Sequence, residues 1–154
     1  MNKFTSLLLG MTLCVSALSA NGTAPSKLQQ DGEIKQQEVD LNKFQNREVL
    51  KMAQAELSKN LPKKIDDYTM LVDVQTKGLT LIYVYEINTG VKSDDTVRRE
   101  DHGRMRSAIV KGSCQSSRRF LDSGISLSYL YNSAASKAKL FQFDVSKKDC
   151  PDFY

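Results

Sequence analysis

The residues best suited to chemistry in this 154-residue sequence are three cysteines, one histidine and a group of arginines. Cys114 and Cys150 could form a disulfide that closes a loop of about 36 residues, worth roughly 3–4 kcal/mol in the chain-entropy model. A redox or nucleophilic cysteine would need an activating neighbour. The sequence has no Cys-x-x-Cys pair, and His102 is its only histidine. We therefore predict a structural disulfide between Cys114 and Cys150 rather than a reactive thiol.

The single histidine lies among acidic residues. His102 follows Glu100 and Asp101, which could orient it as a general base. No nucleophile accompanies it, so we expect a solvated histidine on a charged helix. Asp94 and Asp95 could join these carboxylates around a divalent cation, but their spacing fits no EF-hand loop and suits the start of a helix. We predict no catalytic residue, no metal site and no cofactor.

Six arginines are concentrated in one part of the sequence and form the candidate partner-binding cluster. They are Arg98, Arg99, Arg104, Arg106, Arg118 and Arg119. Arginine binds carboxylates and phosphates bidentately, so an acidic protein surface, a lipid head group or an anionic glycan could dock there. The neighbouring acidic residues could instead neutralise the cluster on a solvated helix. The sequence leaves both interpretations open.

Four tyrosines form two Tyr-x-Tyr pairs, Tyr83 with Tyr85 and Tyr129 with Tyr131. On one face of a sheet they could line a groove for a peptide or a sugar. Tyrosines in such positions more often pack in or beside the core with the hydroxyl in water, which is what we expect here. An exposed sheet edge could also accept a partner strand.

The N-terminus has the pattern of an export signal. One positive charge is followed by an apolar stretch and small residues up to Ala20, and this stretch is shorter than the run of about 20 residues that spans a bilayer. We predict a signal peptide over residues 1–20, cleaved after Ala20 or a neighbouring small residue. Lipidation at Cys14 is not expected, because Leu13 replaces the small residue that precedes a lipidated cysteine. We then expect the mature chain to be soluble and either periplasmic or secreted. Any contact with a membrane should be peripheral.

The remaining sequence is long enough for one domain. The formal net charge of +4 is a mild excess and calls for no nucleic-acid partner. Residues 21–40 are polar with few large apolar side chains, which predicts a flexible leader. Residues 41–154 are predicted to form a single domain.

Hydrophobic periodicity within this domain predicts two helix-hairpin units. The first helix begins between Leu41 and Gln45 and ends at Leu61-Pro62, because a residue before proline avoids the α region. The second begins at Ser93 or Asp94 with a break or kink expected at its glycines, and a short helical turn follows Cys114. The strands expected from Val, Ile, Tyr and Thr content are 68–76 and 79–88, joined at Lys77-Gly78, and 125–131 and 139–145, joined by residues 132–136.

The predicted fold class is therefore α+β. Its order is αββαββ, and the simplest layered arrangement is a four-stranded antiparallel sheet with the helices packed on one face and one disulfide.

Spaced residues from Leu61 to Cys150 carry a resemblance to known proteins. They are Leu61-Pro62, the run Leu79 to Tyr85, Cys114, Arg119-Phe120-Leu121, Gly124, Tyr129-Leu130-Tyr131 and Asp149-Cys150. This pattern resembles small exported α+β proteins of Gram-negative bacteria, most of which lack an assigned activity. It is also similar to secretion-system pilotins and accessory proteins, which are small, exported and disulfide-linked. No functional residue is carried over from either group.

The missing catalytic constellation and the arginine cluster together predict an exported, non-enzymatic protein of the bacterial cell envelope. We expect it to act through contacts with an envelope or secreted protein partner. The alternative is an inhibitor or immunity-type protein that blocks a toxin or a wall hydrolase with a loop, for which Asn132 to Lys137 is the candidate.

Overall fold

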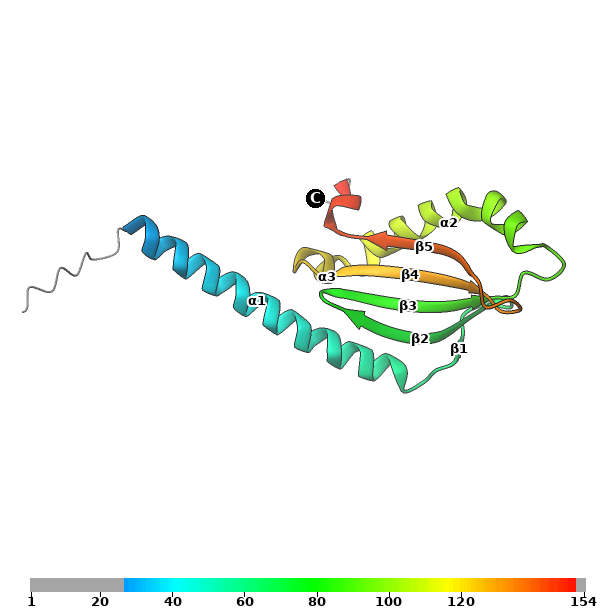
Figure 1. The fold of residues 1–154 in the computed structure, drawn as a ribbon, viewed down its shortest axis with the longest axis horizontal. Helices are drawn as coiled ribbons and strands as arrows, with labels where there is room; N and C mark the ends of the chain where they lie inside the picture. The colour runs from blue at the N-terminus through cyan, green and yellow to red at the C-terminus, as the bar shows by residue number, and fades with distance from the viewer. Residues whose placement is uncertain (1–26, 152–154) are drawn as a thin grey trace, which may run out of the picture.

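A computed structural model describes residues 27–151, with side chains from residue 31 onward (Figure 1). The predicted signal peptide, its cleavage site and Cys14 lie outside the described residues. The elements in chain order are α1 (Lys27–Ser58), β1 (Lys63–Lys64), β2 (Thr69–Lys77), β3 (Thr80–Ile87), α2 (Asp94–Ser116), α3 (Arg118–Asp122), β4 (Ser126–Ser133), β5 (Lys139–Val145) and a 3-10 turn, η1 (Lys147–Asp149).

The sheet has five strands in the order β1-β2-β3-β4-β5. Both predicted hairpins are present and antiparallel, but β3 and β4 pair in parallel, so the prediction of a purely antiparallel four-stranded sheet is wrong. The reason is the connection. The 23 residues of α2 span about 35 Å, enough to return the chain along the whole sheet, so β4 starts at the same end as β3. The two-residue strand β1 was too short to show any periodicity.

The helices pack on one face of the sheet, as predicted. Register places Leu81 of β3 beside Leu127 of β4 and, one strand further, Val145 of β5. These side chains are buried in one cluster with a residue from each helix: Leu50 of α1, Cys114 of α2 and Leu121 of α3. This face therefore holds the core.

The first helix is longer than the sequence indicated. It begins at Lys27, so the prediction of a flexible leader is wrong for residues 27–40, and it ends at Ser58, before the cis Leu61–Pro62 bond. Helix propagation permits the extension, because a helix already nucleated by its packed part adds residues at little cost. Residues 31–45 are nevertheless all exposed, and Figure 1 shows this half of α1 projecting beyond the sheet.

Two local predictions concern turns and caps. The β2–β3 turn consists of Gly78 and Leu79, one residue later than expected, and Gly78 has a φ of 62° that favours glycine. Ser93 caps α2 by accepting a hydrogen bond from the Thr96 amide, as predicted. The helix continues through both of its glycines without a break.

Candidate binding surface

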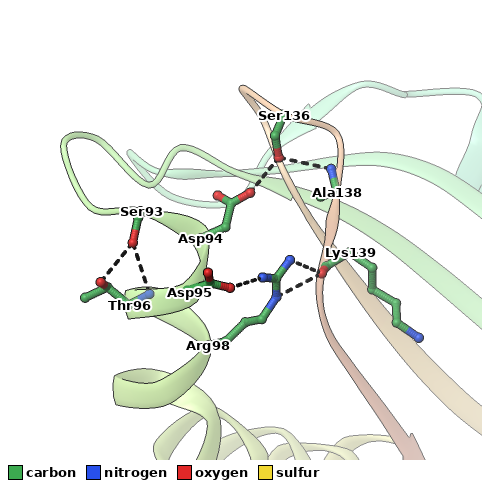
Figure 2. Close-up of polar contacts among 8 residues, drawn as sticks. All are labelled: Ser93, Asp94, Asp95, Thr96, Arg98, Ser136, Ala138 and Lys139. Carbon is green, nitrogen blue, oxygen red and sulfur yellow. Dashed lines mark hydrogen bonds and ion pairs between the residues drawn. The ribbon is translucent and has the colours of Figure 1, made fainter.

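Polar contacts fix the start of α2 to the β4–β5 hairpin (Figure 2). Arg98 donates from Nε and Nη2 to the carbonyl oxygen of Lys139, at 3.2 and 2.9 Å, and from Nη1 to Asp95 at 2.7 Å. Ser136 donates to Asp94 at 2.6 Å, and this bond is the main cause of the lowered pKa of that carboxyl. Arg98, Asp94 and Asp95 thus make contacts inside the domain. Among the described residues, no three His, Cys, Asp or Glu side chains are grouped closely enough to hold a metal ion.

The other arginines of the predicted cluster are distributed over two helices. Arg104 contacts Asp101 at 2.7 Å and has 82% of its side chain exposed. Arg106 lies 3.9 Å from Asp149 on a different side of α2. The remaining three are Arg99, which is exposed on α2, and Arg118 and Arg119 on α3, where Arg118 lies 3.7 Å from Asp122. The structure does not bring the six arginines together in one patch, and their docking role stays a prediction.

His102 lies over two aromatic rings of β5. Its ring centroid is 5.2 Å from that of Phe143 and 6.0 Å from that of Phe141. Its observed contacts are therefore those of a packing residue at the edge of the core.

The predicted disulfide is present. Cys114 of α2 and Cys150, just after η1, are bonded with a Cα–Cα distance of 5.6 Å, and both residues are buried. The bond holds α2 to the end of the chain segment that follows β5.

The four tyrosines lie on the helix-covered face. The parallel register sets Tyr83 beside Tyr129 and Tyr85 beside Tyr131, with stacked rings 5.4 and 4.8 Å apart. Burial raises the pKa of all four phenols, that of Tyr131 to about 12. Because these phenols stay neutral at physiological pH, they offer an apolar ring with a hydroxyl that can donate or accept a hydrogen bond.

Three of these tyrosines form the floor of an open groove, which we call the tyrosine groove. It consists of two adjoining hollows of about 270 and 540 Å³. Tyr85, Tyr129 and Tyr131 form its floor, and Ile65, Asp66 and Thr69 form one side. The α2 side consists of Met105, Ala108, Ile109, Gly112, Ser113, Gln115 and Ser116.

The α2 side of the tyrosine groove is low. Ala108, Gly112 and Ser116 follow one another at four-residue intervals, so they lie along one side of the helix. Their small side chains leave the helix backbone accessible to a bound segment. Ser113 donates to the Tyr129 hydroxyl at 2.8 Å, which fixes the floor against this side. The spacing of the three small residues was visible in the sequence, but only the fold shows that it faces the tyrosines.

A third hollow, of about 580 Å³, continues the tyrosine groove toward the start of α2. It shares Asp66, Thr69 and Met105 with the groove and adds polar and charged groups. Arg104, Lys92 and Asn88 are among them. The combined surface is apolar in the middle and carries charges of both signs at one end, where Arg104 pairs with Asp101 and Lys92 pairs with Glu100.

The loop proposed for an inhibitor, residues 132–137, is held in the fold. The Ser133 amide donates to the Ala138 carbonyl, and Lys137 contacts Glu86 at 2.9 Å. Together with the bond between Ser136 and Asp94, these contacts attach the loop to β3 and α2.

The fold is shared with solved exported proteins. A Pseudomonas aeruginosa protein described as secreted matches with a TM-score of 0.63 and 18% identity, covering 71% of this chain and 96% of its own. The pilotin EpsS of the Vibrio vulnificus type 2 secretion system matches with a TM-score of 0.59, 16% identity and coverage of 72% and 96%. The type II secretion pilotin AspS of Vibrio cholerae matches with a TM-score of 0.55 and 20% identity, covering 73% of this chain and 98% of its own. The predicted likeness to exported proteins and pilotins is confirmed at the level of fold.

Other comparisons bear on family and on membrane segments. No helix among the described residues is both long and apolar enough to cross a bilayer. Comparison with functionally curated proteins finds no match. The model of one family matches residues 44–141, which include the tyrosine groove and most of the sheet. The chain therefore belongs to this family, which is described as a Domain of unknown function (DUF8479).

Proposed function

We propose that this chain is an exported, non-enzymatic accessory protein of the bacterial cell envelope that binds a segment of a partner protein in the tyrosine groove. The observation that carries the proposal is the groove itself, with its aromatic floor and the low side formed by Ala108, Gly112 and Ser116. Two proteins with this fold are described as pilotins of type II secretion systems, which supports an accessory role in secretion. Export rests on the predicted signal peptide.

The chemistry of the groove defines the segment it would bind. Aromatic rings with a polar hydroxyl give large contact areas at small entropic cost, which suits recognition of a peptide. Backbone at Gly112 is open to close approach, so a helix or an extended strand of the partner could lie directly against α2. At the charged end, Arg104 is largely exposed and could pair with an acidic side chain of the partner.

Two glycines of α2 provide a test with a matched control. A side chain added at Gly112 or at Gly103 would meet no heavy atom of the domain within 4 Å. The two positions are nine residues apart, about two and a half turns, and therefore lie on opposite sides of the helix. Gly112→Leu fills the groove, whereas Gly103→Leu adds the same side chain outside it. Both changes raise helix propensity, so neither should lower the melting temperature.

The experiment is affinity capture from envelope extract with wild type and both variants, followed by binding of the purified captured partner measured by calorimetry. We expect Gly112→Leu to weaken binding at least tenfold and Gly103→Leu to leave it unchanged. Arg104→Glu should weaken it less, and the loss should diminish at high salt. Equal binding by wild type, Gly112→Leu and Gly103→Leu would exclude the tyrosine groove as the site.

A further inference from the structure

The exposed side of α1 carries a line of apolar residues that the tyrosine groove does not use. Ile34, Leu41 and Met52 are 56%, 56% and 64% exposed. Met52 follows Ile34 by 18 residues, about five full turns, and Leu41 deviates from the same line by only about 20°. Leu50, which is buried against the sheet, lies almost on the opposite side of the helix. We call Ile34, Leu41 and Met52 the α1 stripe.

The projecting half of α1 lacks a packing partner within the described chain. Its residues 31–45 are all exposed, and Asn46, the next residue, donates a hydrogen bond to the Ser123 carbonyl at the end of α3, at 2.7 Å. Helices in proteins owe most of their stability to packing of an apolar face rather than to propensity. A projecting helix with an apolar line is therefore best explained by a surface that covers it.

Charge identifies that surface. Between residues 31 and 40, α1 has four acidic residues and one basic residue; between 41 and its end at Ser58 it has three basic and two acidic residues. A helix that lies on an anionic membrane would be rich in Lys and Arg, so the acidic half argues against lipid. A second copy of the same helix in antiparallel orientation brings each acidic half against a basic half.

We propose that two copies of this chain associate through antiparallel pairing of their α1 helices along the α1 stripe. The two-fold axis crosses the α1 stripe at the height of residues 43 and 44 along the helix. Ile34 of one copy then lies beside Met52 of the other, and Leu41 lies near the axis. The same arrangement brings Glu33 of one copy near Lys51 of the other. The sheet packs on the opposite side of α1, so both tyrosine grooves stay open.

The oligomeric state of the exported, purified protein tests this pairing by sedimentation velocity over a range of concentrations. We expect a dimer whose dissociation constant rises at least tenfold in Leu41→Asp. Val39→Asp is the matched control: Val39 is also exposed on the projecting half but lies well away from the stripe, so this variant should still dimerise. Because both side chains are exposed, neither variant should unfold. A wild-type protein that is monomeric at its highest soluble concentration would overturn the proposal.

Orientation is tested by cysteine pairing and charge exchange. Ile34→Cys combined with Met52→Cys should give a disulfide-linked dimer, whereas Ile34→Cys alone should not, because the two copies of residue 34 are then about 27 Å apart. Linking by the single variant would contradict the antiparallel arrangement. Glu33→Lys and Lys51→Glu should each weaken the dimer at low salt, and the double exchange should restore it. Loss of dimer with unchanged partner capture in the groove assay would separate this surface from the proposed function.

Discussion

The two halves of the domain are held together in different ways. The C-terminal half, from α2 to η1, has a disulfide, the Arg98 contacts to Lys139 and the bond between Ser113 and Tyr129. The N-terminal half, from α1 to β3, holds its long helix by one buried leucine, Leu50, and by a hydrogen bond that Thr76 of β2 donates to Gln54. A second side-chain hydrogen bond joins Asn46 of this helix to the Ser123 carbonyl, at the end of α3 in the other half. The tyrosine groove lies where the halves meet: its α2 side, Tyr129 and Tyr131 belong to the C-terminal half, whereas Tyr85 and the side with Ile65 belong to the less constrained N-terminal half.

This difference indicates which side of the groove can adapt to a partner. A covalent bond and charge-assisted contacts hold α2 in one position over β4 and β5. The β1 segment, with Ile65 and Asp66, is attached to the sheet by a strand of two residues and by a hydrogen bond from the Ile65 amide to the Thr69 carbonyl, at 2.9 Å. We expect the N-terminal half to open at lower free energy than the C-terminal half.

Removing the disulfide from the C-terminal half should cause the largest loss of stability. Replacing both Cys114 and Cys150 by alanine should lower the free energy of unfolding by about 3–4 kcal/mol, because the unfolded chain regains the entropy of the closed loop. Denaturant unfolding with and without reductant measures the change. A wild-type melt that reductant does not shift would contradict this role of the bond.

Truncating the main anchor of α1 should weaken the other half. Leu50→Ala should cost about 2–5 kcal/mol, because it removes a buried side chain that is 1% exposed and leaves a cavity. Hydrogen exchange should increase first in α1 and β2. Val39→Ala removes an exposed side chain of the same helix and should change stability by no more than about 0.5 kcal/mol. Equal costs for the two variants would show that α1 is not anchored at Leu50.

Two neighbouring arginines of the predicted cluster, Arg98 and Arg99, should differ in how much they contribute to the free energy of unfolding. Arg98→Ala should cost about 1 kcal/mol, since it leaves the Lys139 carbonyl and Asp95 without their donor at a partly exposed site. Arg99→Ala, one residue later and exposed, should cost less than about 0.5 kcal/mol. Thermal unfolding of both variants measures the difference. Equal stability would mean that the contacts of Arg98 in Figure 2 contribute little.

The smallest expected effect is a pH dependence at the end of the C-terminal half. The backbone amide of Ser146, followed by its hydroxyl and Arg106, holds the pKa of Asp149 below its ordinary value of 3.8. A lowered folded-state pKa adds stability above the unfolded value, and this stability is lost as pH falls through the folded pKa. The stability difference between wild type and Asp149→Asn should therefore shrink as pH falls below about 4. A pH-independent difference would exclude this contribution.

Much of the fold could be predicted from local patterns. The two hairpins and the Ser93 cap follow from alternation and capping chemistry. The order of strands could not be predicted in this way. Local periodicity does not state whether the chain between Ile87 and Ser126 returns along the sheet, and that return makes β3 and β4 parallel.

The same distinction holds for the candidate sites. The sequence made the six arginines the candidate partner-binding residues and led us to expect that the four tyrosines pack in or beside the core. The fold stacked the tyrosines across a parallel strand pair, so that they face the small residues of α2, whereas it distributed the arginines over two helices and used Arg98 internally. Proximity between residues 85, 108 and 131 depends on topology, which no short stretch of sequence encodes.

The sequence by itself determined the α+β class, the pairing of Cys114 with Cys150 and the alternation that places tyrosines and core residues on one sheet face. These features depend on residue type and spacing over a few turns or strands. The tertiary structure alone decided the parallel central pair, the projecting half of α1 and the groove between β1 and α2. The parallel pair and the groove arise from long-range packing, in which the free energy gained in the core fixes segments whose own sequences favour no particular position. The projecting half of α1 continues the helix that is packed at Leu50.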